Sequence, residues 1–220
     1  MLDAVPKFIN EGFRTACVPP ESMDKLWEAG WRHFGTHFFR YSLGFYGSEI
    51  RRVLPLRIRL ADYRHSKSLR RTLRRNSSLR CTISPVNITE RHSELFERHK
   101  QRFDQGVPDS IYNFISPAHP QPCETRQLDV YQDESLIASS FFDVGETAVS
   151  GIYAMFEPSE GTRSLGIFTL LKEIDLAIDR GMEFYYLGYA YDGESFYDYK
   201  KRFRGTEEFD WNGQWKELSQ

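Results

Sequence analysis

The chain is poor in cysteine and has no long hydrophobic run. Its 220 residues include three cysteines, Cys17, Cys81 and Cys123, which are odd in number and far apart. This excludes a disulfide framework and predicts a reducing compartment. No run approaches the roughly 20 apolar residues of a membrane span, and the first residues lack a basic segment followed by an apolar one. We therefore expect a cytoplasmic protein with no membrane partner.

Motifs for nucleophilic catalysis and for metal binding are also lacking. The sequence has no G-x-S-x-G motif and no convincing pair of cysteine and histidine. The six histidines are too scattered to predict a metal site: His33, His37, His65, His92, His99 and His119. We expect a reaction that needs neither a strong protein nucleophile nor a metal.

The formal net charge of -2 hides a strong asymmetry. Between Arg51 and Arg80 a single acid, Asp62, stands among many basic residues, whereas the chain after Gly106 is clearly acidic. A cationic stripe beside an acidic region is typical of a protein that binds a polyanion and something else. At this length the chain forms one large domain or two small ones that share an interface.

The densest basic segment predicts a helix that contacts RNA. Ser66 can cap a helix in which Leu69 and Leu73 lie four residues apart on one face. The remaining surface of the helix carries neighbouring cations whose repulsion phosphates would relieve. These are Lys67, Arg70, Arg71, Arg74 and Arg75. The alternative is a solvated helix whose charges pair with acids from the second half of the chain. Contacts with the RNA backbone would not identify its bases.

Further arginines of the first half lie beside aromatic or apolar residues. Arg57 and Arg59 alternate with apolar residues as in a strand, so both guanidinium groups should share one face. Together with Arg32 and Arg40 they could line a nucleic-acid groove. Ion pairs with acids across a sheet explain each of them equally well.

The second half predicts an antiparallel meander, a helix and one more strand. After a helix that begins at Thr89, strand-like runs separated by turn signals cover residues 126–132, 136–144 and 148–156. Residues 164–180 then place apolar side chains at helical spacing, and Gly181 is suited to end that helix.

The last predicted strand, residues 183–190, is rich in tyrosine. Alternation places Tyr185 and Tyr189 on one face and Tyr186 and Gly188 on the other. Gly188 leaves room for a ligand or a neighbouring backbone. The tyrosines could stack on a bound base, although taken alone they are more typical of a core.

Several segments occur in the order typical of one enzyme family. In the second half these are residues 148–158, 163–166 and 185–189, the pair Tyr199 and Lys200, and Trp215. In the first half they are residues 30–32, 39–40, 54–58 and 66–76. In these segments the chain resembles the aminoacyl-tRNA protein transferases, the arginyl and leucyl transferases of the N-degron pathway.

The resemblance implies an α/β fold with a GNAT-like acyltransferase core, in agreement with the order meander, loop, helix and strand. It divides the chain into a basic N-terminal subdomain, residues 1–80, and a GNAT-like C-terminal domain, residues 81–220. The implied reaction transfers an amino acid, arginine or leucine, from aminoacyl-tRNA to the N-terminal α-amine of a protein or peptide, with an acidic first residue. The implied partners are that tRNA and the acceptor polypeptide, with no DNA.

The resemblance also implies roles for individual residues. Catalytic roles fall on Tyr189, Tyr199 and Lys200, and substrate binding falls on Arg163, Ser164, Leu165, Gly166, Gly188 and Arg204. Contacts with tRNA fall on Arg32, Arg40, Arg57, Lys67, Arg70, Arg71, Arg74 and Arg75. In this hypothesis Lys200, with Arg163 or Arg204, binds the carboxylate of the acceptor or the terminal phosphate, while the two tyrosines shape the ester pocket.

Two departures from the family pattern limit what can be transferred. The family carries a cysteine cluster between the positions of Arg40 and Leu54, and this chain has none there. Cys17 could be a remnant of the other, more N-terminal cysteine motif. We therefore expect no iron-sulfur cluster, no metal and no cofactor besides the aminoacyl-tRNA. Phe196 and Tyr197 replace the family's lysine and methionine, so the preference for an acceptor could differ.

Three other functions would use part of the same fold or the same tRNA contacts. An acetyl-coenzyme A dependent N-acetyltransferase would use the same core, but residues 161–166 have too few glycines for a convincing coenzyme A loop. A noncatalytic relative would bind tRNA without transfer. A third possibility keeps the chemistry and uses a dedicated acceptor peptide.

Overall fold

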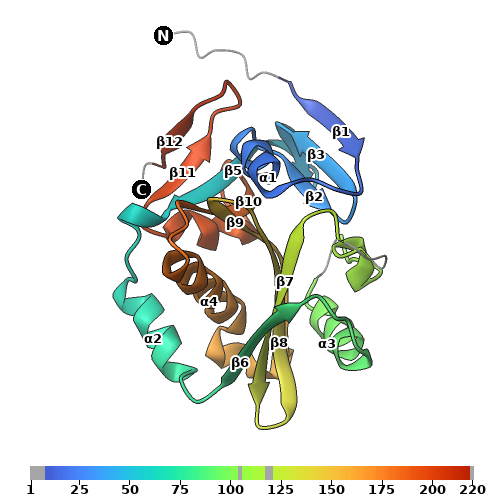
Figure 1. Cartoon of the computed structure of the whole chain (residues 1–220), viewed down its shortest axis with the longest axis vertical. Coiled ribbons are helices and arrows are strands. Elements are labelled where there is room, and N and C mark those ends of the chain that lie inside the picture. The colour runs from blue at the N-terminus through green and yellow to red at the C-terminus, as the bar shows by residue number, and fades with distance from the viewer. Residues whose placement is uncertain (1–7, 104–105, 117–120, 219–220) are drawn as a thin grey trace.

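The computed structural model describes residues 8–103, 106–116 and 121–218, and its centre is a large mixed sheet (Figure 1). The strands of this sheet follow the order β12-β11-β5-β10-β9-β8-β7-β6, and β4 pairs with β5 beside that path. Their bounds are β4 Leu43–Tyr46, β5 Glu49–Arg59, β6 Arg80–Pro85, β7 Glu124–Gln132, β8 Ser135–Val144, β9 Ala148–Phe156, β10 Phe184–Tyr191, β11 Thr206–Phe209 and β12 Trp215–Glu217.

The second half folds as its sequence predicts. Strands β7, β8 and β9 form an antiparallel meander, helix α4 (Leu165–Asp179) follows, and β10 returns parallel to β9. Gly181, with a φ of +71°, follows the end of α4, where a residue with a β-carbon would be strained. Meander, helix and returning parallel strand form the expected GNAT-like core of a mixed α/β fold.

Two helices cover opposite faces of the meander (Figure 1). Helix α4 packs on one face with Phe142 in the main hydrophobic cluster. Helix α3 (Glu90–Lys100) packs on the other face, where Phe96 contacts a second cluster that contains Phe141. The neighbours Phe141 and Phe142 therefore point to opposite sides, as alternation in a strand requires.

The first half of the chain contributes directly to this sheet. Strand β5 lies between β10 and β11, so the division at residue 80 separates the sequence but not the sheet. Ahead of β4 in the chain lie a small sheet of order β1-β3-β2 and helix α1. Their bounds are β1 Asn10–Arg14, α1 Pro20–Glu28, β2 Arg32–Phe34 and β3 His37–Tyr41.

The predicted basic helix is present as α2 (Lys67–Arg75). The Ser66 hydroxyl accepts a hydrogen bond from the Leu69 amide at 3.3 Å, which is an N-terminal cap. Leu69 and Leu73 pack against the main hydrophobic cluster, and α2 lies beside α4 (Figure 1). The apolar face of α2 is therefore satisfied, and its cationic face is left to solvent or a ligand.

The predicted alternation of tyrosines in β10 is wrong because the strand contains a bulge. Tyr186 pairs with Arg57 and Gly188 pairs with Leu56, so Leu187 is an extra residue. Gly188 has a φ of +81°, a conformation that a side chain would strain. The extra residue reverses the alternation of side chains after the bulge. Tyr189 therefore lies on the same face of the sheet as Tyr186, and not on the face of Tyr185 as predicted.

Arg57 is buried, and its charge is already paired with an acid of the same sheet. Its guanidinium donates to Glu207 at 2.7 Å and lies over the rings of Phe184 and Trp215, at 3.8 and 4.3 Å from their centroids. Both Arg57 and Glu207 are buried, whereas Arg59 contacts the same carboxylate from a half-exposed position. Glu207 of β11 therefore pairs with both arginines across the sheet, and the Asp62 carboxylate lies 3.6 Å from the Arg59 guanidinium.

Candidate active site

A cavity of about 790 Å³ lies where β9 and β10 separate. The two strands pair only over Phe184–Tyr186 and Ala148–Ser150, and they part at the bulge in β10. Side chains of α3, α4, β2, β3 and the short helix η4 (Phe196–Arg202) complete the walls. The cavity therefore collects residues from both halves of the chain.

Seven of the residues implied by the resemblance line this cavity. They are Arg32, Ser164, Gly166, Gly188, Tyr189, Tyr199 and Lys200. Gly166 permits a close contact, because a β-carbon there would lie 3.0 Å from Phe156. Tyr189 donates its hydroxyl hydrogen to the Gly30 carbonyl at 2.7 Å. Tyr199 is 37% exposed as a whole residue, and desolvation of its hydroxyl group raises its pKa to about 12. Both tyrosines are neutral at physiological pH.

Lys200 is an amine held inside the cavity with little compensation for its charge. Its ammonium donates to the carbonyl oxygen of Tyr189 at 2.9 Å and lies 5.0 Å from the centroid of the Tyr197 ring. Burial, and then repulsion from Arg32, lower the pKa of Lys200 to about 7. An anion that entered the cavity would favour the charged form of this amine.

Arg32 belongs to the cavity and not to the surface that carries α2. Its guanidinium donates to the Ser150 hydroxyl and to the Gly151 carbonyl, both on β9. Burial lowers the pKa of Arg32, although a guanidinium stays charged at any physiological pH. With Lys200 it places two cations in one cavity wall.

Glu173 and Tyr185 are functional candidates that the sequence analysis missed. Glu173 is buried on α4 and lines the cavity, and it accepts hydrogen bonds from the hydroxyl groups of Ser140 and Tyr185. Burial raises the pKa of Glu173 to about 7, although both hydrogen bonds oppose this shift. A sequence signal existed, because Glu173 lies three or four residues from Leu170, Leu176 and Ala177, on the apolar face of the helix.

The other implied substrate-binding residues lie elsewhere. Arg163 donates to Glu160 at 2.6 Å, and Leu165 is fully buried in the main hydrophobic cluster. Arg204 lines a separate groove with Arg64 and Arg202. The structure therefore does not bring Arg163, Leu165 or Arg204 together with Lys200.

The cations of α2 lie outside the cavity lining, and one of them contacts a segment of the cavity wall. Among the residues that the structure describes, no ion pair joins an acid to Lys67, Arg70, Arg71, Arg74 or Arg75. This leaves the solvated alternative without its expected acidic partners. Arg75 donates to the Thr162 carbonyl in the short helix η3 (Pro158–Arg163), and Pro158 and Gly161 of that helix line the cavity.

Arg40 is held close to the small sheet. It donates to Glu11 at 2.8 Å and to the Ala29 carbonyl at 2.9 Å, and its guanidinium lies 4.9 Å from the centroid of the Trp31 ring. It is neither in the cavity lining nor on α2. Among the described residues, one group of side chains could hold a metal, namely His33, Cys123 and Asp143, and it also lies outside the cavity lining.

The GNAT-like core and the cavity at its parted strands agree with the acyltransferase fold that the sequence resemblance implies. Residues 89–210 match the family model described as "Arginine-tRNA-protein transferase, C terminus", and the chain belongs to this family. This agrees with the resemblance seen in its sequence. No helix in the described part of the chain combines the length and apolar character needed to cross a membrane.

Similar proteins cover most of the chain. It is 27% identical over 202 residues to an aspartate/glutamate leucyltransferase of Acinetobacter baumannii, covering 90% of this chain and 73% of the relative. It is 28% identical over 207 residues to a protein of the same name from Marinobacter nauticus, covering 93% of this chain and 85% of the relative.

Two solved structures give weaker similarity. FemX gives a TM-score of 0.49 at 9% identity, with 85% of this chain and 65% of FemX covered. The C-terminal domain of a protein described as a lysylphosphatidylglycerol synthetase, from Agrobacterium fabrum, gives 0.48 at 16% identity, with 84% and 55% covered. This chain thus spans less than two thirds of either of them.

Replacement of Glu173 by Gln should change how stability depends on pH. The pKa of Glu173 is about 7 in the folded chain and about 4.5 when unfolded, so between these values the folded state binds more protons. The wild-type protein should therefore lose stability from this group as pH rises from about 4.5 to 7, and E173Q should not. Urea unfolding at pH 5 and pH 7.5 measures the difference, with E134Q at an exposed turn as the control. A parallel loss in E173Q and wild type would contradict the assignment.

Proposed function

We propose that this protein transfers an amino acid, preferably leucine, from aminoacyl-tRNA to the N-terminal α-amine of a polypeptide that begins with Asp or Glu. Family membership supports the reaction type. The printed names of the relatives, aspartate/glutamate leucyltransferase, support the acceptor and the donor. The observation that carries the proposal is the pair of cations, Arg32 and Lys200, inside the cavity.

Electrostatics favours an acidic acceptor. Repulsion from Arg32 contributes to the low pKa of Lys200, and the partial burial of both side chains limits their contact with water. A carboxylate bound between the two cations would replace the hydration that they lack and keep Lys200 charged. An amide of the same shape would not do so, which gives the cavity a reason to distinguish Asp from Asn.

The walls of the cavity are mainly apolar, which favours leucine as the donor. Ile152, Ile167, Leu170 and Leu187 line it, together with several aromatic rings. An isobutyl side chain gains from contact with such a surface, whereas a guanidinium would need a partner for its charge. Glu173 is the acid of the lining that could serve arginine, and its two oxygens already accept hydrogen bonds.

The chemistry needs alignment and a proton acceptor. The α-amine attacks the ester carbonyl, a peptide bond forms, the bond to the ribose oxygen breaks, and that oxygen leaves with a proton. An aminoacyl ester is already activated, so positioning supplies much of the rate. The Tyr185 hydroxyl donates to Glu173, and we assign to this pair the uptake of the amine proton. A carboxylate with a pKa of about 7 is suited to accept a proton at neutral pH.

Helix α2 is the part of the surface that we assign to tRNA. Its unpaired cations can bind phosphates, and Arg75 contacts the segment at the cavity wall. The backbone of the acceptor stem would lie along α2 while the 3′ end enters between β9 and β10. This arrangement separates our proposal from an acetyl-coenzyme A transferase, which has no use for the α2 cations.

The reaction is tested by mass spectrometry of synthetic peptides incubated with the protein, total tRNA, synthetases and all amino acids. A gain of one leucine residue on peptides beginning with Asp or Glu is the expected result. A gain of arginine would correct the donor only. An acetyl group acquired from acetyl-coenzyme A, or tRNA binding without any product, would support the two other functions and overturn this one.

The variant Lys200→Met should lose most transfer to acidic peptides. A charged hydrogen bond contributes about 1.5–3 kcal/mol, so we expect kcat/KM to fall about 10- to 100-fold. The matched control is Lys201→Met, because the Lys201 ammonium pairs with Asp198 at 2.8 Å and is not part of the cavity lining. Equal activity of the two variants would refute the role of Lys200.

The double variant R71A/R74A should weaken tRNA binding without altering peptide recognition. Removal of two phosphate contacts should reduce the slope of log affinity against log salt concentration by about 2. Filter binding at several salt concentrations measures this slope. The control is R98A, because Arg98 lies on α3 and already pairs with Glu157 at 2.7 Å. An unchanged slope in the double variant would place the tRNA elsewhere.

A further inference from the structure

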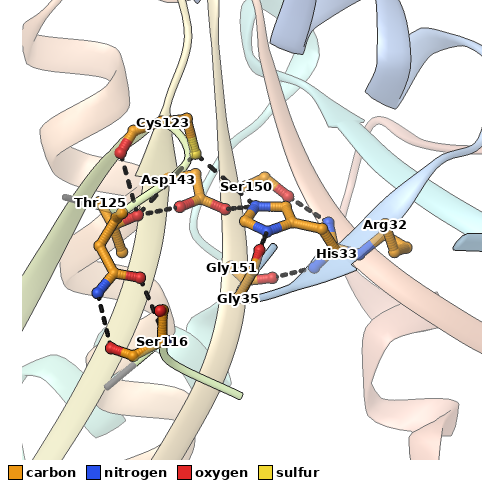
Figure 2. A network of polar contacts seen from close by, with 10 residues as sticks. Arg32, His33, Gly35, Ser116, Cys123, Thr125, Asp143, Ser150 and Gly151 are labelled. Carbon is orange, nitrogen blue, oxygen red and sulfur yellow. Dashed lines mark hydrogen bonds and ion pairs between the residues drawn. The ribbon is translucent and has the colours of Figure 1, made fainter. Parts of the chain in front are cut away.

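Three different metal-binding side chains meet between the small sheet and the large one (Figure 2). His33 comes from β2, Cys123 precedes β7, and Asp143 lies on β8. The His33 Nε2 atom lies 2.7 Å from the Asp143 carboxylate and 3.7 Å from the Cys123 sulfur. The three donor atoms all lie within 4.8 Å of one another.

Neighbouring groups hold these side chains in fixed orientations. The His33 Nδ1 lies 2.8 Å from the Gly35 carbonyl, which accepts a hydrogen from it and directs Nε2 towards the cluster (Figure 2). The Thr125 hydroxyl donates to the second carboxylate oxygen of Asp143 at 2.6 Å. Hydrogen bonds of this kind orient the ligands of protein-bound metals.

The arrangement does not fit a catalytic cysteine. In nucleophilic catalysis the thiol and the acid contact different nitrogens of the histidine, so that the acid orients the base. Here both the Cys123 sulfur and the Asp143 carboxylate lie near the same atom, Nε2. A shared position of a nitrogen, a sulfur and an oxygen is what a metal ion requires.

The distances agree with a tetrahedral ion after a small adjustment. Zinc bonds of about 2.0 Å to nitrogen or oxygen and 2.3 Å to sulfur would separate nitrogen and sulfur by roughly 3.5 Å and nitrogen and oxygen by roughly 3.3 Å. The distance from the His33 nitrogen to the Cys123 sulfur is 3.7 Å in the structure. The distance from the same nitrogen to the Asp143 oxygen is 2.7 Å, which is a hydrogen bond. This distance would have to increase by roughly 0.6 Å when the ion replaces the bridging proton.

We propose that His33, Cys123 and Asp143 bind one zinc-like divalent cation that joins β2 to the large sheet. A thiolate and a carboxylate neutralise the double charge of the ion, which suits a buried site. Cys123 is half-buried, so the ion has a route of entry. Because Arg32 adjoins His33, the ion also fixes the strand that carries a cavity cation. The prediction from scattered histidines did not anticipate this cluster, because its members are brought together only by folding.

Cobalt(II) provides a direct probe of the site. We expect the full chain, freed of metal by a chelator, to bind one equivalent and to show a sulfur-to-cobalt charge-transfer band that zinc removes. Cys123→Ser should abolish that band and weaken zinc binding by about 10-fold or more. Cys17→Ser, at an exposed cysteine, should retain the band. Circular dichroism and thermal melting establish that each variant is folded.

The second variant keeps the fold and the thiol. Thr125→Val removes only the hydroxyl that orients Asp143, so it should lower zinc affinity about 10- to 100-fold while the charge-transfer band persists. The wild-type protein should also melt at a higher temperature with zinc than with chelator. Absence of the band in the wild type, or its persistence in Cys123→Ser, would overturn the proposal and leave a buried hydrogen bond between His33 and Asp143. These readouts do not depend on transferase activity.

Discussion

The separation of β9 from β10 is the constraint on which the site depends. The two strands pair over three residues and then part where Leu187 is added and Gly188 adopts a positive φ. The neighbouring strand β5 stays paired with β10 on both sides of the bulge, with its register shifted by one residue, so the separation opens only towards β9. A cavity at the centre of a sheet results, and residues far apart in the sequence line it.

Parting two strands leaves polar backbone groups that need partners. Arg32 donates to the Gly151 carbonyl on β9, and Lys200 donates to the Tyr189 carbonyl on β10. Each cation therefore donates a hydrogen bond to a backbone carbonyl of one of the two separated strands, and it also lines the cavity. The geometry that opens the cavity thus explains the positive charge inside it, and an anionic substrate group would find that charge poorly solvated.

The sequence predicts local structure well where periodicity and caps agree. The meander, α4 with Gly181 after it, and α2 capped by Ser66 all follow the patterns of their own residues. It fails where a single residue alters a pattern, as Leu187 does in β10. A bulge depends on the partner strand, and that partner, β5, comes from the other half of the chain.

The candidate site was predictable only in part, for a similar reason. Tyr189, Tyr199 and Lys200 follow from the resemblance and share one cavity. Arg32 and Arg57 both lie beside apolar or aromatic residues in the sequence. In the structure Arg32 lines the cavity, whereas Arg57 is buried against Glu207. Which arginine meets an acid is decided by tertiary contacts.

The central claim, that two partly buried cations select an acidic acceptor, is tested most directly by comparing two peptides that differ only in Asp or Asn at the first position. Leucine transfer from Leu-tRNA is measured as kcat/KM for each. The account predicts at least a roughly 10-fold preference for the Asp peptide, because the amide lacks the charge that pairs with Arg32 and Lys200. Equal rates for the two peptides would contradict it.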